Sequence, residues 1–172
     1  MMNSSKLHFV LQQGVTDARP EGCELLYSAL MFQPRVIGVV VVLGLILQSW
    51  VLFLALALIL LWNVLLPQLN LFDMAYNHLI ARPRGLKALD SAPAPRRFAQ
   101  GEASSFMLGI ALALFFEWGV TAWILEGLLV LSLALLNFGR FCLGSYTYHL
   151  LHGNARFANH TLPWSHTGTA AR

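Results

Sequence analysis

The sequence predicts an all-α integral membrane protein with four transmembrane helices arranged as two helical hairpins. Three observations lead to this fold class: a very apolar composition, two long apolar blocks that are each interrupted near the middle, and an uneven distribution of cations. Of the 172 residues, 57% are hydrophobic and 11% are charged, whereas an average soluble domain has about 25% charged residues. A chain of this length has room for one membrane domain with short tails.

The two apolar blocks run from Val36 to Leu66 and from Ala103 to Gly139. As a single helix the first block would be about 46 Å long, which is too long for a hydrocarbon core of about 30 Å at ordinary tilt angles. Each block contains a polar interruption with a tryptophan, and Gly119 in the second offers a tight turn. We therefore expect four transmembrane helices: Arg35–Gln48, Ser49–Leu66, Phe98–Phe116 and Val120–Phe138.

The 11 Lys and Arg residues test this number of helices, because none of them lies in either expected hairpin turn. They occur before the first block, in the central loop and after the second block. With four helices all three groups lie on one side of the membrane, which the positive-inside rule makes cytoplasmic. With two long helices they would divide almost equally between the two sides. We expect a multi-pass membrane protein with both termini cytoplasmic.

These helices divide the chain into five segments. They are a cytoplasmic N-terminal tail with an interfacial segment (1–33), a first transmembrane hairpin (34–66), a basic cytoplasmic loop (67–97), a second transmembrane hairpin with a helical extension (98–151) and a disordered C-terminal tail (152–172). In the loop, Leu71, Met74 and Leu79 have helical spacing and indicate a short interfacial helix. Each half has a basic entry and a Trp-bearing turn, which leaves a parallel internal repeat as an open alternative.

The stretch FCLGSYTYHLLHG, after the fourth helix, contains the residues best suited to chemistry. If the helix continues into it, Cys142, Ser145, His149 and His152 lie on one helical face. Cys142 is the candidate catalytic residue, because a nearby cation activates a thiol. His149 and His152 are candidate metal ligands, although zinc ordinarily takes three or four ligands. The alternative is that Cys142 packs as a small hydrophobe while the histidines lie at the wet interface.

Glu126 is the candidate intramembrane acid, because it lies well inside the fourth expected helix. A carboxyl group in a membrane is costly without a partner and is a functional candidate for that reason. Proton transfer or transport would normally use several such groups. The alternative is that a protonated Glu126 forms a structural hydrogen bond to Gln48 or Ser49 on a neighbouring helix.

Two motifs, RRFAQG (96–101) and GRFCLGSYTYHLL (139–151), make the chain resemble a bacterial membrane family catalogued as a domain of unknown function, number 4395. The resemblance covers roughly residues 34–151 and implies four membrane helices and a location in a bacterial cytoplasmic (inner) membrane. Members commonly have Cys-x-Gly-Cys at the second motif, which looks like a dithiol pair. Here Cys142 and Gly144 match, but Ser145 replaces the second cysteine. The resemblance therefore implies monothiol chemistry, through a mixed disulfide with a partner or with Cys23.

We expect a small accessory or structural subunit that associates, within the lipid bilayer, with other membrane proteins or with copies of itself. The alternatives are a thiol-linked redox component that uses Cys142 and a small transporter that uses Glu126. The sequence has no Walker loop, dinucleotide fingerprint or His-Glu-x-x-His motif, which favours a non-enzymatic role without cofactors or nucleic acid. The small residues suited to helix association are Gly38, Gly44, Gly109 and Gly127.

Overall fold

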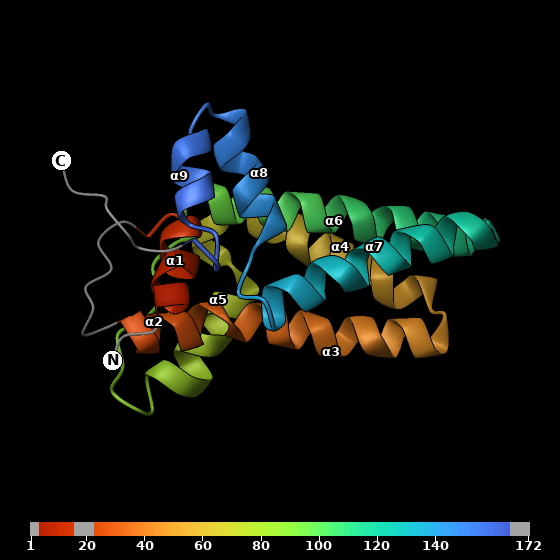
Figure 1. The fold of residues 1–172 in the computed structure, drawn as a ribbon. Helices are drawn as coiled ribbons and strands as arrows, with labels where there is room; N and C mark the ends of the chain where they lie inside the picture. The colour runs from red at the N-terminus through yellow and green to blue at the C-terminus, as the bar shows by residue number, and fades with distance from the viewer. Residues whose placement is uncertain (1–3, 16–22, 166–172) are drawn as a thin grey trace.

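The computed structural model describes residues 4–15 and 23–165, and in these ranges all regular structure is helical. Figure 1 shows a bundle of long apolar helices with shorter helices gathered at one end, and the two hairpin turns at the other. The long helices are α3 (Phe32–Leu47), α4 (Trp50–Leu65), α6 (Ala94–Phe115) and α7 (Gly119–Asn137). The shorter helices are α1 (Ser4–Gln12), α2 (Cys23–Leu30), α5 (Leu71–Tyr76), α8 (Leu143–Leu151) and α9 (Ala155–His160).

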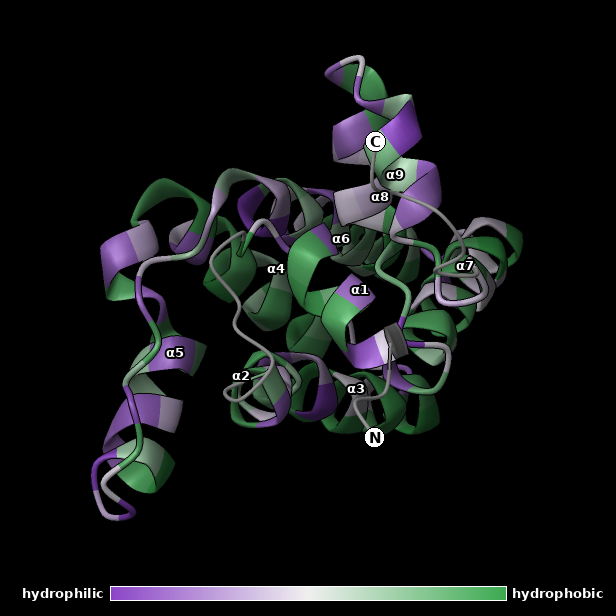
Figure 2. Ribbon diagram, turned by 60° about the vertical axis from the view of Figure 1, so that its left-hand side comes forward, coloured by the Kyte–Doolittle hydropathy of each residue, from purple (hydrophilic) through white to green (hydrophobic). Residues whose placement is uncertain are grey.

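Three helical spans are long and apolar enough to cross a membrane: Cys23–Leu47, Ala94–Phe115 and Gly119–Asn137. The remaining apolar helix, α4, is shorter, with 16 residues, which corresponds to about 24 Å. Figure 2 shows hydrophobic residues over much of the bundle, and large apolar side chains such as Val120 and Trp123 are exposed. An apolar surface of this extent is rare on soluble proteins and suits a lipid environment.

The first apolar span begins earlier than the expected Arg35. Only Met31 separates α2 from α3, and helical hydrogen bonds continue through it, from Met31 N–H to the Tyr27 carbonyl and from Arg35 N–H to the Met31 carbonyl. The span of 25 residues is about 37 Å long. The candidate span therefore begins at Cys23, within the segment 1–33 that we expected to be a cytoplasmic tail.

Both hairpins turn where the sequence predicted, between α3 and α4 and between α6 and α7. The residues that make the turns are not glycines: Gln48 has φ 45° and Glu117 has φ 58°, in the left-handed region that ordinary residues seldom adopt. The expectation that Gly119 supplies the second turn is wrong, because Gly119 is the first residue of α7. The polar side chains of Gln48 and Glu117 suit a position outside the apolar bundle.

The core of the bundle lies mainly between α4 and α6, which make the most extensive helix contact. Glycines allow close packing inside this chain: a Cβ on Gly44 would lie 3.1 Å from the Phe53 ring, and one on Gly109 would lie 3.3 Å from Leu125. The space beside these two glycines is therefore filled by side chains of this same chain. The buried core residues include Ile37, Val41, Phe53, Leu56, Leu60, Met107, Ile110 and Leu129.

The expected helical extension of the fourth helix is wrong. Helix α7 ends at Asn137, Arg140 has φ 54°, and α8 begins afresh at Leu143. A Cβ on Gly139 would lie 2.6 Å from the Leu135 carbonyl oxygen. The chain therefore turns too tightly at Gly139 to accommodate any side chain there. The break places Cys142 at the N-cap of α8 and not on its face.

The expected disorder of residues 152–172 is also wrong for the part that the structure describes. Residues 155–160 form α9, which packs on α8, and the His160 ring lies 5.6 Å from the His8 ring of α1. Residues 166–172 lie outside the described ranges. The C-terminal helices and α1 thus form a cap over one end of the bundle, which we call the polar cap (α1, α8 and α9).

The expected short helix in the central loop is present as α5 followed by one π-helical turn, η3 (Asn77–Ala81). Its apolar residues Leu71, Met74 and Leu79 are exposed, whereas Asp73 and Tyr76 face the protein and are buried. This arrangement suits a helix that lies in a membrane interface. The interfacial position itself and the internal repeat stay predictions.

Candidate functional site

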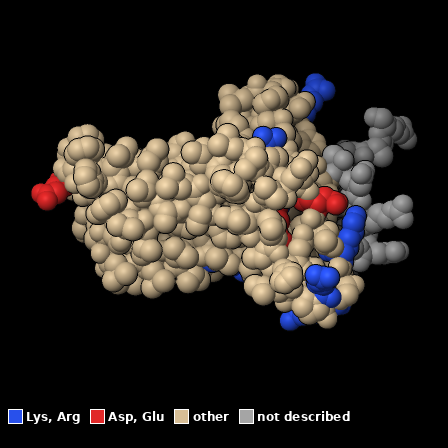
Figure 3. Space-filling view, turned by 180° about the vertical axis from the view of Figure 1, so that it is seen from behind, with Lys and Arg blue, Asp and Glu red and all other residues tan. Residues whose placement is uncertain are grey.

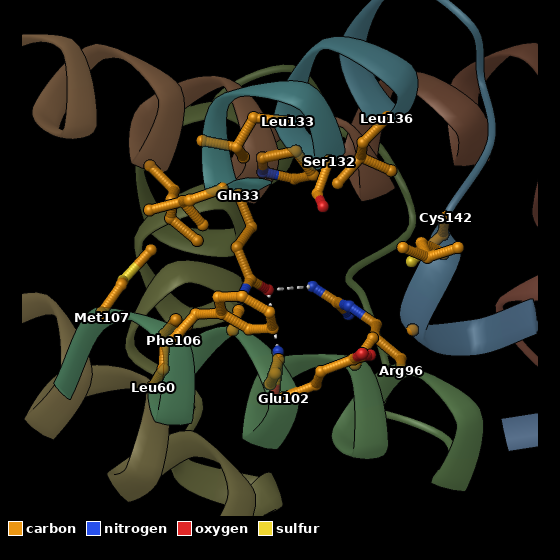
Figure 4. A pocket seen from close by; sticks show the side chains of 18 of the residues that line it. Gln33, Leu60, Arg96, Glu102, Phe106, Met107, Ser132, Leu133, Leu136 and Cys142 are labelled. Atoms are coloured by element: carbon orange, nitrogen blue, oxygen red, sulfur yellow. Dashed lines mark hydrogen bonds between the residues drawn. The ribbon is translucent and has the colours of Figure 1, made fainter. Parts of the chain in front are cut away.

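A cavity of about 200 Å³ lies between α6 and α7 at the end of the bundle nearest the polar cap. The two helices meet at their hairpin turn and diverge toward this end (Figure 1), so the cavity is lined by the first half of α6 and the second half of α7. Residues of α1, α2, α3, α4 and α8, together with Cys142, complete its wall. Figure 4 shows Ser132 and Leu133 of α7 opposite Phe106 and Glu102 of α6.

A buried polar network forms one end of the cavity. The Arg96 guanidinium donates two hydrogen bonds to the Asp73 carboxylate, at 2.9 and 2.6 Å, and a third to Gln33 Oε1 at 2.8 Å. Gln100 Nε2 donates to the same Gln33 oxygen at 2.9 Å. Arg96 and Asp73 are only 5% and 6% exposed. This network joins α3, α5 and α6, and it fixes the position of Arg96 beside the cavity.

Cys142 lies on the wall of this cavity, at the N-cap of α8. Its backbone N–H donates to Gln12 Oε1 at 3.0 Å, which ties the start of α8 to α1. Cys23 is also buried and belongs to the same apolar cluster as Cys142, but it does not line the cavity.

Gly144 allows α8 to approach α6 very closely. A Cβ at this position would lie 2.7 Å from Ala99 Cα and 2.7 Å from Glu102 Oε2. Next to it, the buried Ser145 hydroxyl donates to the Pro95 carbonyl oxygen at 3.4 Å. Both residues of the Gly144–Ser145 pair therefore hold Cys142 against the cavity by packing α8 on the start of α6.

Glu102 and Gln100 give the cavity two hydrogen-bond acceptors without partners. In the described part of the chain Glu102 forms no ion pair and no hydrogen bond, although it is partly buried. The Oε1 atom of Gln100 is buried and also lacks a partner within the described residues. Buried polar atoms are nearly always paired, so the unpaired Gln100 Oε1 is an unusual feature of the cavity.

The structure gives the metal hypothesis no support. His149 Nε2 donates to the Gln12 carbonyl oxygen at 3.1 Å, and His152 Nδ1 donates to the Tyr148 carbonyl oxygen at 2.9 Å. Among the residues that the structure describes, no group of three or more His, Cys, Asp or Glu side chains can hold a metal ion. The two histidines are also not alike, because His149 is buried and His152 is exposed.

Glu126 is buried in α7 but does not line the cavity. Its carboxylate accepts hydrogen bonds from Gln48 Nε2 at 3.3 and 3.4 Å. This is the hydrogen bond to Gln48 that we expected if Glu126 has a structural role. A role of Glu126 in transport stays a prediction without further support from the geometry.

Sequence reasoning expected Cys142 on a helical face with Ser145, His149 and His152, whereas Cys142 lies at the N-cap of α8, and it missed most of the polar groups at the cavity. It treated Arg96 as part of a basic loop, and it did not single out Gln33, Asp73, Gln100 or Glu102. One signal was available: Gln100 and Glu102 are two polar residues only two positions apart on a helix that leads into an apolar block. Polar residues at such a boundary are expected to face protein or a cavity.

The fold and the site together define an all-α protein with several candidate membrane spans and a cysteine-lined cavity at the polar end of the bundle. The chain belongs to the family described as Domain of unknown function (DUF4395), whose model matches residues 28–152. This match confirms the resemblance inferred from the RRFAQG and GRFCLGSYTYHLL motifs. Neither the curated proteins nor the solved structures contain a match to the chain.

Proposed function

We propose that this protein is a multi-pass protein of a bacterial inner membrane, with four helices across the bilayer and both termini in the cytoplasm. Its charge distribution supports this orientation. Figure 3 shows Lys and Arg side chains gathered at the end that carries the polar cap, while an acidic residue marks the tip at the other end. The hairpin turns contain no Lys or Arg, as the positive-inside rule expects for the outer side.

The short helix α4 is compatible with this arrangement. A helix of about 24 Å is shorter than a hydrocarbon core of about 30 Å. Local thinning of the bilayer accommodates such a mismatch at a small free-energy cost. The exposed residues Leu66 and Leu69 extend the apolar surface beyond the end of α4 at Leu65.

Within this membrane protein, the function that the geometry supports best is that of a thiol-linked component acting through Cys142. The observation that carries the proposal is the position of Cys142 at a helix N-cap on the wall of the cavity. The reaction is thiol–disulfide exchange: the Cys142 thiolate attacks a disulfide of another molecule, one S–S bond forms and one breaks, and the second sulfur leaves as a thiolate. Ser145 stands where a second cysteine would be and has no thiol to attack the mixed disulfide. The mixed disulfide therefore persists until a thiol from elsewhere resolves it.

The two other hypotheses have less geometric support. Three of the four glycines assigned to helix association contact residues of this chain, namely Gly38, Gly44 and Gly109, and only Gly127 has open space around it. An accessory or structural subunit therefore remains the second proposal, with α7 as its exposed helix. A transporter remains the third, because Glu126 is bonded to Gln48 outside the cavity.

The thiol proposal is tested by modification of single-cysteine variants in native membranes. In Cys23→Ala only Cys142 remains, and in Cys142→Ala only Cys23 remains, so each variant is the control for the other. Both cysteines are buried, but only Cys142 lines the cavity. We expect Cys142 to react with an apolar maleimide and with an apolar disulfide much faster than Cys23 does, as measured by the mass of the intact protein.

A buried cysteine that only packs would behave differently. If both thiols react equally slowly until the protein is unfolded, Cys142 has no special access or activation and the thiol function is wrong. Reaction of Cys142 with a charged reagent as fast as with an apolar one would contradict the apolar character of the site.

A further inference from the structure

The cavity has the size and lining of a binding site for an apolar chain. Engineered apolar cavities of about 150 Å³ bind a benzene molecule, and this cavity measures about 200 Å³. Its walls are formed largely by apolar side chains, so a ligand inside it would be in an apolar medium over most of its length. The apolar lining includes Ile37, Leu60, Phe106, Met107, Leu129 and Leu133.

The cavity also reaches the surface of the bundle. Leu128 of α7 lines it and is 46% exposed, and Leu143 at the start of α8 lines it and is 40% exposed. Leu128 lies in one of the candidate membrane spans. A molecule dissolved in the bilayer can therefore approach the cavity past α7 without crossing the polar cap.

The polar end of the cavity offers acceptors and no spare cation. The positive charge of Arg96 is compensated by Asp73, and its guanidinium is further bonded to Gln33. What remains unpartnered within the described residues is Gln100 Oε1, on a side chain only 5% exposed, and the Glu102 carboxylate. Unpaired buried acceptors are unfavourable until a donor reaches them.

From these groups we infer that the cavity binds a lipid-like molecule with an alkyl chain and a head that donates hydrogen bonds, a hydroxyl or an amine. The chain lies among the apolar residues, and the head donates to Gln100 Oε1 and to Glu102. Anionic heads are disfavoured, because Arg96, the cation among the residues that line the cavity, is already paired with Asp73 and bonded to Gln33. This inference concerns the same cavity as the proposed thiol function, but binding does not require the thiol.

The test is photolabelling of the full-length protein in lipid nanodiscs. The probes share one alkyl chain with a photoactivatable diazirine and differ in the head: hydroxyl, amine, carboxylate or methyl. We expect the hydroxyl and amine probes to label peptides of α6 and α7, and the carboxylate and methyl probes to label them weakly. A monoacylglycerol probe distinguishes a glycerolipid head from a free long-chain alcohol or amine, which share this chemistry. Equal labelling by all four heads would overturn the inference.

Two serines provide matched variants. The Ser132 hydroxyl donates to the Leu128 carbonyl oxygen at 2.8 Å and lines the cavity, whereas the Ser105 hydroxyl makes the same kind of bond to Gly101 at 3.0 Å on an exposed face. Ser132→Phe fills the cavity and should abolish hydroxyl-probe labelling, while Ser105→Phe should leave it unchanged. Labelling of Ser132→Phe at the wild-type level would show that the ligand lies elsewhere.

A second pair keeps the inference testable if Ser132→Phe fails to fold. Gln100→Met removes the free acceptor with little change of volume, and Gln68→Met is its control on an exposed residue outside the cavity. We expect about fivefold weaker competition by unlabelled alcohol in Gln100→Met, and no change in Gln68→Met. Labelling should persist in Cys142→Ala, so failure of the thiol proposal and failure of this inference are distinguished.

Discussion

Arg96 and Asp73 show how a single buried pair connects the surface helix α5 to the bundle. Both side chains are almost fully buried, and each carboxylate oxygen of Asp73 accepts a hydrogen bond from the guanidinium. Removing two charges from water is expensive, and the pair is tolerated because the geometry is bidentate and Gln33 takes a further donor. The stability of the fold depends on this pair, because removing either residue leaves the charge of the other buried without compensation.

Replacing one partner of this pair should destabilise the protein strongly. Asp73→Ala leaves the Arg96 charge buried without compensation, and we expect a loss of about 3–5 kcal/mol in the free energy of unfolding. The control is Lys87→Ala, because the Lys87–Asp90 pair is 90% and 89% exposed and exposed pairs contribute about 0–1 kcal/mol. Thermal unfolding in a mild detergent measures both. Equal stabilities of the two variants would contradict this account of the pair.

At the scale of helices, the sequence predicted the apolar elements well and the connections poorly. The hairpins at residues 48–49 and 116–118 could be predicted, because polar residues interrupted apolar blocks that were too long for one helix. The break between α7 and α8 could not, because it depends on how Gly139 meets the Leu135 carbonyl. The Arg96–Asp73–Gln33 network was equally hidden, because its members are separated by 23 and 63 residues.

The contact of α8 with α6 gives a prediction at the same scale. Gly144→Ala places a Cβ 2.7 Å from Ala99 Cα, so α8 must move away from α6 at an expected cost of about 1–3 kcal/mol. Gly127→Ala is the matched control, because a Cβ there meets no atom within 4 Å and alanine favours a helix. Unfolding measurements compare the two, and modification of Cys142 should become faster only in Gly144→Ala. An unchanged rate there would mean that α8 does not shield the thiol.

For the whole molecule, the decisive quantity is the number of helices that cross the bilayer. If all four cross, the hairpin tip at Glu117 lies outside and the loop around Lys87 lies inside. If the short helix α4 does not cross, the loop lies outside and this tip lies inside. The cation distribution favours four crossings, whereas only three spans in the described part of the chain are both long enough and apolar enough to cross a membrane.

Cysteines introduced at these two positions distinguish the arrangements. Glu117→Cys and Lys87→Cys are made separately in a Cys23→Ala, Cys142→Ala background, and both positions are exposed. A membrane-impermeant maleimide should label Glu117→Cys in spheroplasts and Lys87→Cys only in inverted membrane vesicles. Labelling of Lys87→Cys from outside would show that α4 does not span the membrane and would overturn the proposed orientation.

In the polar cap, helix α1 packs against segments that are made much later during translation. Gln12 holds the Cys142 N–H across a separation of 130 residues, and His8 donates to the Leu162 carbonyl oxygen across 154 residues. A ribosome therefore delivers α1 before its partners α8 and α9, which follow all four long helices in the sequence. Until then one side of α1 has nothing to pack against. The part of the cavity that α6 and α7 line is therefore made before its α8 wall, which follows α7 in the sequence.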